Sequence, residues 1–219
     1  MMFKILLAIS LPLSMMVFVF SGRARRNSIF LLIGLVVTFI ASYVNLWLGY
    51  LPVSDVYYVS NIGPIVEEIL KAIPILIYAF IKKPERQDLL EGGLSVGLGF
   101  AIIENVTYMI RFTDRITLLA ALFRGLGAGM MHGLTTMVVA FGMSFITSKK
   151  KLFFVGTLTF MSIAISFHSI YNMLVQSQFQ IIGFLIPIVT FMIILIIFKN
   201  HNFDHNFDYT LSDIRRILK

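Results

Sequence analysis

The sequence has 219 residues, of which 58% are hydrophobic and 13% charged, and its mean hydropathy is +0.89. These values exclude an ordinary soluble domain and a disordered chain, and they indicate a multi-pass protein of the cell membrane, surrounded by the lipid bilayer. The absence of cysteine excludes disulfides, thiolate metal sites and cysteine nucleophiles. The net charge of +7 comes from short basic clusters between apolar runs, which indicates membrane orientation and no nucleic-acid partner.

Seven apolar runs are each close to or longer than the ~20 residues that cross a bilayer as a helix. They cover residues 3–21, 29–51, 56–81, 92–110, 117–146, 152–175 and 181–198. The sequence therefore predicts an all-α transmembrane helical bundle of about seven spans. The long fifth span is expected to tilt or to begin at the interface.

The basic residues predict an extracytoplasmic N-terminus and a cytoplasmic C-terminus. Thirteen of the 18 Lys and Arg residues fall on one side of the predicted spans and three on the other, while Lys71 and Arg124 lie within spans. Because arginines follow the first apolar run at residues 23–26, that run is expected to be a retained helix and not a signal peptide. The C-terminal tail contains His201 and His205, which could bind a metal but are expected to be solvated.

Three ionisable side chains, Glu67, Glu68 and Lys71, lie in the middle of the third apolar run, between Pro64 and Pro74. A charge at the centre of a membrane helix costs about 2.5 to 3.5 kcal/mol on insertion scales, so such residues normally face a protein interior or a water-filled cavity. Lys71 follows Glu67 by four residues and Glu68 by three, so it can neutralise either carboxylate. One carboxylate is then left without a cation. The two prolines are expected to kink this span.

The next three spans each carry further polar residues, namely Glu104, His132, and the pair His168 and Asn172. The pair lies on one helical face because its members are four residues apart. Counted from the span starts, the depths below the outer surface are ~10 Å for Glu104 and His168, ~15 Å for Glu67 and ~20 Å for His132. These depths overlap within the error of the span boundaries.

Each of these polar residues has a structural alternative. A single intramembrane His or Asn often only joins helices, through a hydrogen bond worth ~0.6 to 2 kcal/mol. Glu104 could pair with Arg124 or Lys71, and the glycines of the fourth and fifth spans indicate close helix packing. Four consecutive spans carry three Glu, two His and an Asn, with two cations to balance the carboxylates, and helix packing alone does not account for this. The pattern therefore predicts a functional polar site.

The order and spacing of these motifs resemble those of the PrsW family of intramembrane proteases. The motifs are Glu-Glu-x-x-Lys at residues 67–71, Phe-x-x-x-Glu-Asn at 100–105, His132, and His-x-x-Tyr at 168–171, so the resemblance covers residues 63–172. The PrsW family belongs to a superfamily with the CAAX prenyl endopeptidases and bacteriocin-immunity-type membrane proteases. Asn172 stands where the PrsW motif has Asp, and His-x-x-x-Asn is similar to the CAAX version.

The resemblance implies an intramembrane endopeptidase that acts on a transmembrane protein, in regulated proteolysis of a single-pass substrate such as an anti-sigma factor. A CAAX-type enzyme would instead process a lipidated C-terminal segment. We accordingly predict a four-helix catalytic core at residues 56–176, preceded by two helices in residues 1–55 and followed by the last span and a cytoplasmic tail in residues 177–219.

The candidate catalytic residues divide by role. We predict that Glu67 takes a proton from water while Glu68 binds Lys71, although the reverse assignment of the two glutamates is nearly as good. Burial disfavours a charged carboxylate and Lys71 favours it. These opposing effects could leave one carboxylate basic enough to take a proton near neutral pH. His168 and Asn172, which share a face, suit an oxyanion hole.

Glu104 and His132 would orient the water, either directly or through a metal. Together with His168 they could bind zinc through a carboxylate and two imidazoles. No His-Glu-x-x-His motif is present, and Lys71 would repel a metal cation, so a mechanism without a cofactor is favoured.

Two other classes of function are considered. A non-catalytic membrane scaffold, like one subunit of the gamma-secretase complex, would not need intact Glu and His motifs. A proton- or ion-coupled transporter would also use buried Glu and His, but the chain has no internal repeat. The oligomeric state is not predicted.

Overall fold

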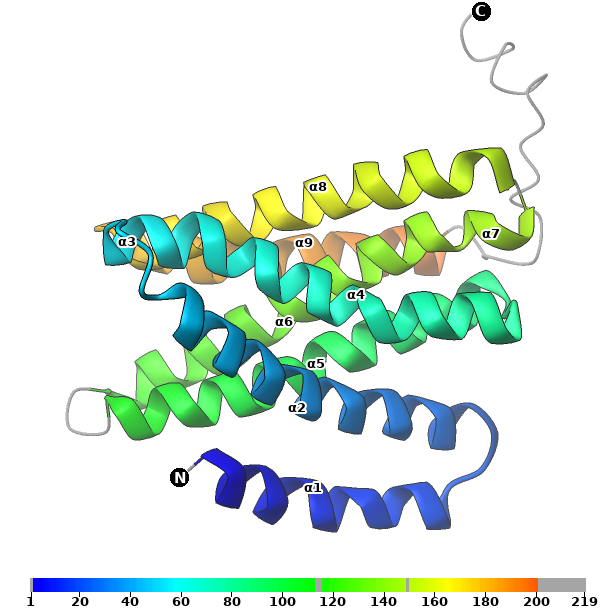
Figure 1. Cartoon of the computed structure of the whole chain (residues 1–219), viewed down its shortest axis with the longest axis horizontal. Coiled ribbons are helices and arrows are strands. Elements are labelled where there is room, and N and C mark those ends of the chain that lie inside the picture. Colours follow the sequence, from blue (N-terminus) through cyan, green and yellow to red (C-terminus); the bar gives the residue numbers. More distant parts are fainter. Residues whose placement is uncertain (1, 113–115, 149, 201–219) are drawn as a thin grey trace, which may run out of the picture. The chain divides into compact units, whose positions relative to one another are not determined.

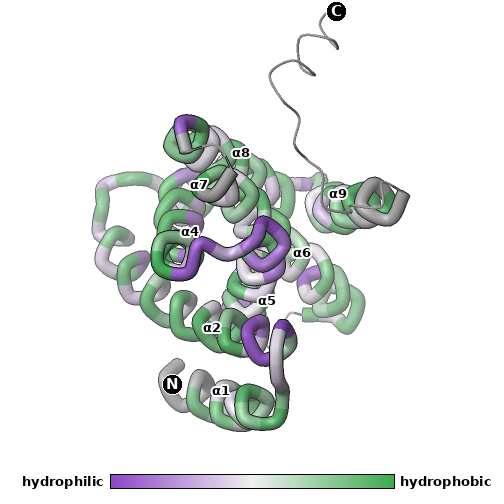
Figure 2. The backbone as a smooth tube through the Cα atoms, turned by 90° about the vertical axis from the view of Figure 1, so that its right-hand side faces the viewer, coloured by the Kyte–Doolittle hydropathy of each residue, from purple (hydrophilic) through white to green (hydrophobic). Residues whose placement is uncertain are grey.

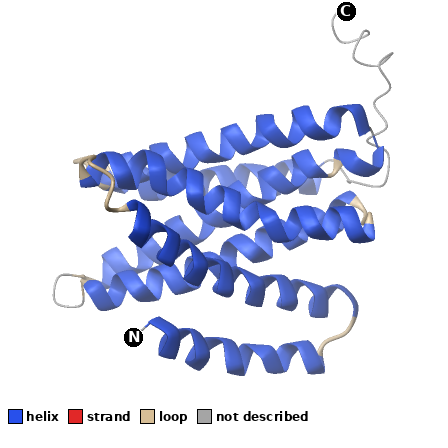
Figure 3. Cartoon of the chain, viewed as in Figure 1, coloured by secondary structure: helices blue, strands red, loops and turns tan. Residues whose placement is uncertain are grey.

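The computed structural model describes residues 2–112, 116–148 and 150–200, and every regular element within them is a helix (Figure 3). This confirms the all-α polytopic bundle. The long helices are α1 (Met2–Val19), α2 (Gly22–Leu48), α4 (Gly63–Lys82), α5 (Arg86–Arg111), α6 (Leu118–Met143), α8 (Lys150–Val175) and α9 (Gln180–Asn200). The short elements are α3 (Asp55–Tyr57), the π-helix η1 (Tyr58–Ile62) and α7 (Phe145–Ser148). His201 and His205 lie outside the described residues.

Within the described residues, four helices are long and apolar enough to cross a membrane, namely α2, α5, α6 and α8. Helix α4 has 20 residues but carries Glu67, Glu68 and Lys71 close together. The apolar parts of α1 and α9 are shorter. The chain is therefore a multi-pass membrane protein.

The third predicted span, residues 56–81, is helical throughout, but it is not one regular α-helix. It is divided into α3, the π-helix η1 and α4. Pro64 lies in the first turn of α4, where its missing N–H group is tolerated. Pro74 lies inside α4, where it leaves the carbonyl of Leu70 without its usual N–H partner. Helix α2 also begins earlier than the predicted run, at Gly22, because arginine favours a helix even though it is not apolar.

The chain forms two units, Met1–Ile188 and Val189–Lys219, and α9 runs through the boundary between them. Within the first unit, α5 lies between α2 and α6 and packs closely on both, and α6 also packs on α8 (Figure 1). Helix α4 contacts α2, α5, α6 and α8, so the residues of the Glu-Glu-x-x-Lys motif lie among the helices that carry the other motifs.

Two glycine contacts bring α5 close to its neighbours. A Cβ atom at Gly97 would lie 2.1 Å from the carbonyl oxygen of His132 on α6, and one at Gly34 of α2 would lie 2.2 Å from the carbonyl oxygen of Val96. Any larger residue would force these backbones apart, as expected for small residues at membrane helix interfaces. The first contact also places the backbone of His132 directly on α5, the helix that carries Glu104.

Hydrophilic segments gather at one end of the first unit, where α2 begins and where α4 leads into α5 (Figure 2). Arg26 of α2 binds Asp88 and Glu91 of α5 there, with both N–O distances at 2.6 Å. Because two carboxylates hold one guanidinium, this end of α2 is fixed to α5.

Candidate active site

Lys71 and Glu68 form the ion pair expected from their spacing. Nζ of Lys71 lies 2.7 Å from Oε1 of Glu68, and neither side chain is exposed. The ammonium also lies 3.1 Å from Nδ1 of His132 and 3.3 Å from Oγ1 of Thr135. Three acceptors therefore satisfy its three N–H groups. The ring of Phe100 covers the ammonium, with its centroid 5.1 Å away.

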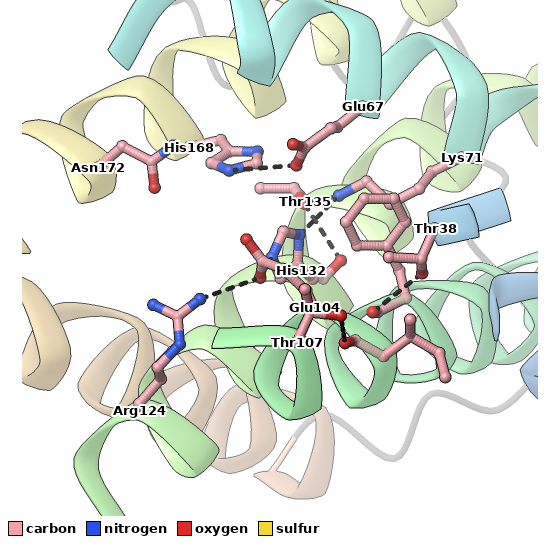
Figure 4. A network of polar contacts seen from close by, with 12 residues as sticks. Thr38, Glu67, Lys71, Glu104, Thr107, Arg124, His132, Thr135, His168 and Asn172 are labelled. Carbon is pink, nitrogen blue, oxygen red and sulfur yellow. Dashed lines mark hydrogen bonds and ion pairs between the residues drawn. The ribbon is translucent and has the colours of Figure 1, made fainter. Parts of the chain in front are cut away.

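His132 is oriented through both of its ring nitrogens. A lysine ammonium can only donate, so Nδ1 of His132 accepts and Nε2 carries the proton. Nε2 lies 2.8 Å from Oε2 of Glu104, to which it donates. The same carboxylate oxygen lies 3.6 Å from Nη2 of Arg124. Glu104 thus joins a histidine of the buried site to an arginine nearer its edge (Figure 4).

His168 is held between the two glutamates of α4. Its Nδ1 lies 2.8 Å from Oε1 of Glu68, which as a carboxylate accepts the proton. The other ring nitrogen, Nε2, lies 3.8 Å from Oε2 of Glu67, and Figure 4 shows these two side chains facing each other. This distance is too long for a direct hydrogen bond but suits a bridging water.

Glu67 uses its two oxygens differently. Oε1 accepts a hydrogen bond from Nδ2 of Asn45 at 3.1 Å, whereas Oε2 is buried and has no hydrogen-bond partner in the described part of the chain. The side chain is 14% exposed, so it is mostly buried but still accessible to water. Asn45 is itself held by the hydroxyl of Tyr58, which donates to Oδ1 at 2.9 Å. Asn45 and Tyr58 are not among the site residues predicted from the sequence, although an asparagine inside an apolar run is a signal of a polar site.

Asn172 binds the π-helix that precedes α4. Its Nδ2 donates to the carbonyl oxygen of Val59 at 2.9 Å, which uses one of the two amide N–H groups. His168, the other residue predicted for the oxyanion hole, has its Nδ1 proton bound to Glu68. Of these two residues, Asn172 is the one that retains an N–H group for a ligand.

A group that could hold a metal ion is present, but its members differ from the expected set. Ligand atoms of Glu67, His132 and His168 all lie within 4.8 Å of one another, and Glu67 takes the place of Glu104. Two imidazoles and a carboxylate are typical of catalytic zinc sites. However, Nδ1 of His132 accepts from Lys71 and Nε2 donates to Glu104, so this ring has no free lone pair. The hydrogen-bonded arrangement therefore does not fit a metal bound through His132.

Arg124 and Tyr171 add polar groups near Glu104. The guanidinium of Arg124 lies 3.7 Å from the centre of the Tyr108 ring. Nε of Arg124 and the hydroxyl of Tyr171 are buried without hydrogen-bond partners among the described residues. Such atoms mark positions where a water or a substrate group can bind.

A buried centre of carboxylates and imidazoles inside a multi-pass helical bundle is typical of an intramembrane hydrolase. The family model described as PrsW family intramembrane metalloprotease matches residues 13–198, and the chain belongs to this family. It is therefore an intramembrane protease, in agreement with the resemblance of its motifs. No curated protein and no solved structure matches the chain.

Proposed function

We propose that this protease hydrolyses a peptide bond of a membrane-embedded or membrane-proximal substrate with a water that Glu67 activates. One observation carries the proposal: Oε2 of Glu67 is buried, has no hydrogen-bond partner among the described residues, and lies 3.8 Å from Nε2 of His168. A water between these two atoms would donate one hydrogen to each of them.

Glu67 takes a proton from this water as the water oxygen forms a bond to the carbonyl carbon of the peptide. The tetrahedral intermediate then breaks its C–N bond, and Glu67 returns the proton to the leaving amine. His168 orients the water through Nε2, and Glu68 holds the ring by binding its Nδ1 proton. A positioned base of this kind contributes about 10² to 10⁴ to the rate.

The negative charge on the substrate oxygen needs donors. We assign this role to the second N–H group of Asn172, with Nε of Arg124 as a further donor. A lost oxyanion donor costs about 10² to 10³ in rate. Lys71, His132 and Glu104 position the centre, since His132 is hydrogen-bonded to Lys71 through Nδ1 and to Glu104 through Nε2.

The family description contains the word metalloprotease, whereas the mechanism proposed here uses no metal. The reason is the tautomer of His132: while Lys71 donates to Nδ1, neither ring nitrogen offers a lone pair to an ion. The hydrogen bonds around His132 therefore support the glutamate-type mechanism.

The substrate we propose is a single-pass transmembrane protein, such as an anti-sigma factor, on the basis of the PrsW-like motifs. A lipidated C-terminal segment is the second candidate, because the spacing of His168 and Asn172 is similar to that of the CAAX endopeptidases. The extracytoplasmic N-terminus predicted from the basic residues would place the acids in the outer half of the membrane.

The test uses purified protein in liposomes with a library of transmembrane reporter peptides. We expect the wild type to cleave, and Glu67→Gln and His168→Gln to lose at least about 10² in rate while they still bind the reporter. Glu85→Gln is the matched control, because Glu85 is exposed at the start of α5. Equal cleavage by all variants would exclude this mechanism, and reporter binding without any cleavage would favour a non-catalytic scaffold.

A further inference from the structure

A groove runs along the outside of the first unit between α2 and α4, with the end of α1 beside it. Its volume is about 560 Å³, and apolar side chains line it, among them Val36 of α2 and Ile77 of α4. These two side chains are 46% and 52% exposed, so the groove is open to its surroundings. A second cavity of about 430 Å³ shares Ile33 and Pro74 with the first and extends it to the ends of α2 and α4. We call the two together the α2/α4 groove.

Positive charge lies at one end of the α2/α4 groove. Arg25 and Lys82 line this end, both are exposed, and neither forms an ion pair within the described residues. Arg26, the neighbour of Arg25, is different because its guanidinium is bound to Asp88 and Glu91. The end of the groove therefore offers two cations that no carboxylate of the described chain neutralises.

We propose that the α2/α4 groove binds an anionic glycerophospholipid, with its phosphate headgroup on Arg25 and Lys82 and one acyl chain along the groove. A ligand of this site needs an anionic head and a long apolar tail. Basic pockets between membrane helices are typical sites for anionic headgroups. From Arg25 to Ile40, the groove follows α2 for 15 residues, which is about 22 Å and longer than the ~15 Å of one leaflet's hydrocarbon. A whole acyl chain fits along it.

Size distinguishes this ligand from the transmembrane helix of a substrate. A spanning helix about 30 Å long and about 10 Å wide occupies more than ~2,000 Å³. The larger cavity of the groove holds about 560 Å³, far below that value. The α2/α4 groove could therefore enclose a single acyl chain, whereas a second helix could only lie on it with most of its volume outside.

The shape of α2 and α4 explains why the groove exists. Helix α2 is held to α5 by the close contact at Gly34 and by the ion pairs of Arg26. Pro74 interrupts the hydrogen bonds of α4 beside the groove. Leu70 also lines the groove and directly precedes Lys71, so a bound lipid contacts the helix that carries Glu67. The binding site does not depend on the proposed catalytic mechanism.

The test is native mass spectrometry of the full chain, released from detergent with either phosphatidylglycerol or phosphatidylcholine of the same acyl chains. We expect the wild type to retain phosphatidylglycerol preferentially. In the double variant Arg25→Gln/Lys82→Gln the preference should fall about ten- to thirty-fold, because each substitution removes one basic contact to the headgroup. The control Arg111→Gln/Lys151→Gln removes the same charge away from the groove and should keep the preference. An unchanged preference in the first variant, or an equal loss in both, would overturn the proposal.

A second measurement locates the lipid. Because the chain has no cysteine, Ile73→Cys introduces a single thiol in the groove for a fluorescent label. Phosphatidylglycerol with brominated acyl chains should quench this label more strongly than brominated phosphatidylcholine, and Arg25→Gln/Lys82→Gln should remove the difference. Equal quenching by both lipids overturns the proposal, as does displacement of the lipid by a transmembrane peptide that protects the thiol.

Discussion

Glu68 binds His168 across one hundred residues of sequence, through a contact of 2.8 Å between Oε1 and Nδ1. The same oxygen accepts from Lys71 at 2.7 Å. Glu68 therefore neutralises the buried lysine and orients the histidine at once, which leaves Nε2 of His168 directed toward Glu67. The two adjacent glutamates of α4 consequently have different surroundings, and this supports Glu67 as the one that contacts the water.

Replacement of Lys71 by Met should destabilise the protein strongly, because Glu68 would remain buried without a cation. Breaking a buried ion pair from one side typically costs about 3 to 5 kcal/mol. The measurement is thermal unfolding in detergent. The double variant Glu68→Gln/Lys71→Met should recover part of the stability because neither position of the pair then carries a buried charge. Lys151→Met, at an exposed position, should unfold like the wild type. If the single and double variants had the same unfolding temperature, Lys71 would not stabilise the protein by neutralising the buried Glu68.

Asn45 should act as a positioning residue for Glu67. Asn45→Ala removes the hydrogen bond to Oε1, so we expect kcat to fall by about tenfold with little change in KM, as for a lost bond to a charged group. Asn45→Asp should lose more, because it puts a second carboxylate next to Glu67. Ser42→Ala is the control on the same helix, since the hydroxyl of Ser42 donates to the backbone carbonyl of Thr38 and to no site residue within the described part of the chain. A KM effect alone would instead indicate a role in substrate binding.

The local parts of the site could be predicted from sequence, and the tertiary parts could not. The pairing of Glu68 with Lys71 follows from helical spacing within one element. The bond from Asn45 to Glu67 and the bond from Asn172 to the π-helix depend on how α2 and α8 pack on α4, which spacing does not encode.

The same limit explains two of the differences between the prediction and the structure. Apart from its polar residues, the run 56–81 is apolar on both sides of Gly63, so the change from π-helix to α-helix there leaves no signal in the apolar pattern. The expected zinc set contained Glu104 because the motifs alone do not show which carboxylate faces both histidines. In the structure Glu67 faces them, while Glu104 binds His132 and Arg124.

Removal of metal ions should leave cleavage undiminished. The expectation follows from His132, whose two ring nitrogens are engaged by Lys71 and Glu104. The measurement is reporter cleavage by protein in liposomes after treatment with a strong chelator, with the metal content determined by elemental analysis. A zinc-dependent protease treated in parallel shows that the chelator works. Loss of activity that zinc restores would contradict the glutamate-type mechanism and would support a metal at Glu67, His132 and His168.

Replacement of Gly97 by Ala should impair both stability and catalysis. The added Cβ would lie 2.1 Å from the carbonyl oxygen of His132, so α5 and α6 would have to separate and the ring of His132 would move from Glu104. Small-to-large changes in a packed core typically cost about 1 to 3 kcal/mol, and a shift of about 1 Å at an active site can cost 10²-fold in rate. The two effects are measured by thermal unfolding in detergent and by reporter cleavage.

The matched control is Gly125→Ala on α6, where an added Cβ meets no atom within 4 Å. This variant should be neutral or slightly more stable, because alanine favours a helix over glycine by about 1 kcal/mol. A loss of activity in Gly97→Ala with unchanged stability would show that the contact serves the site and not the fold. Equal behaviour of both variants would mean that the close approach of α5 and α6 at His132 is not needed for either.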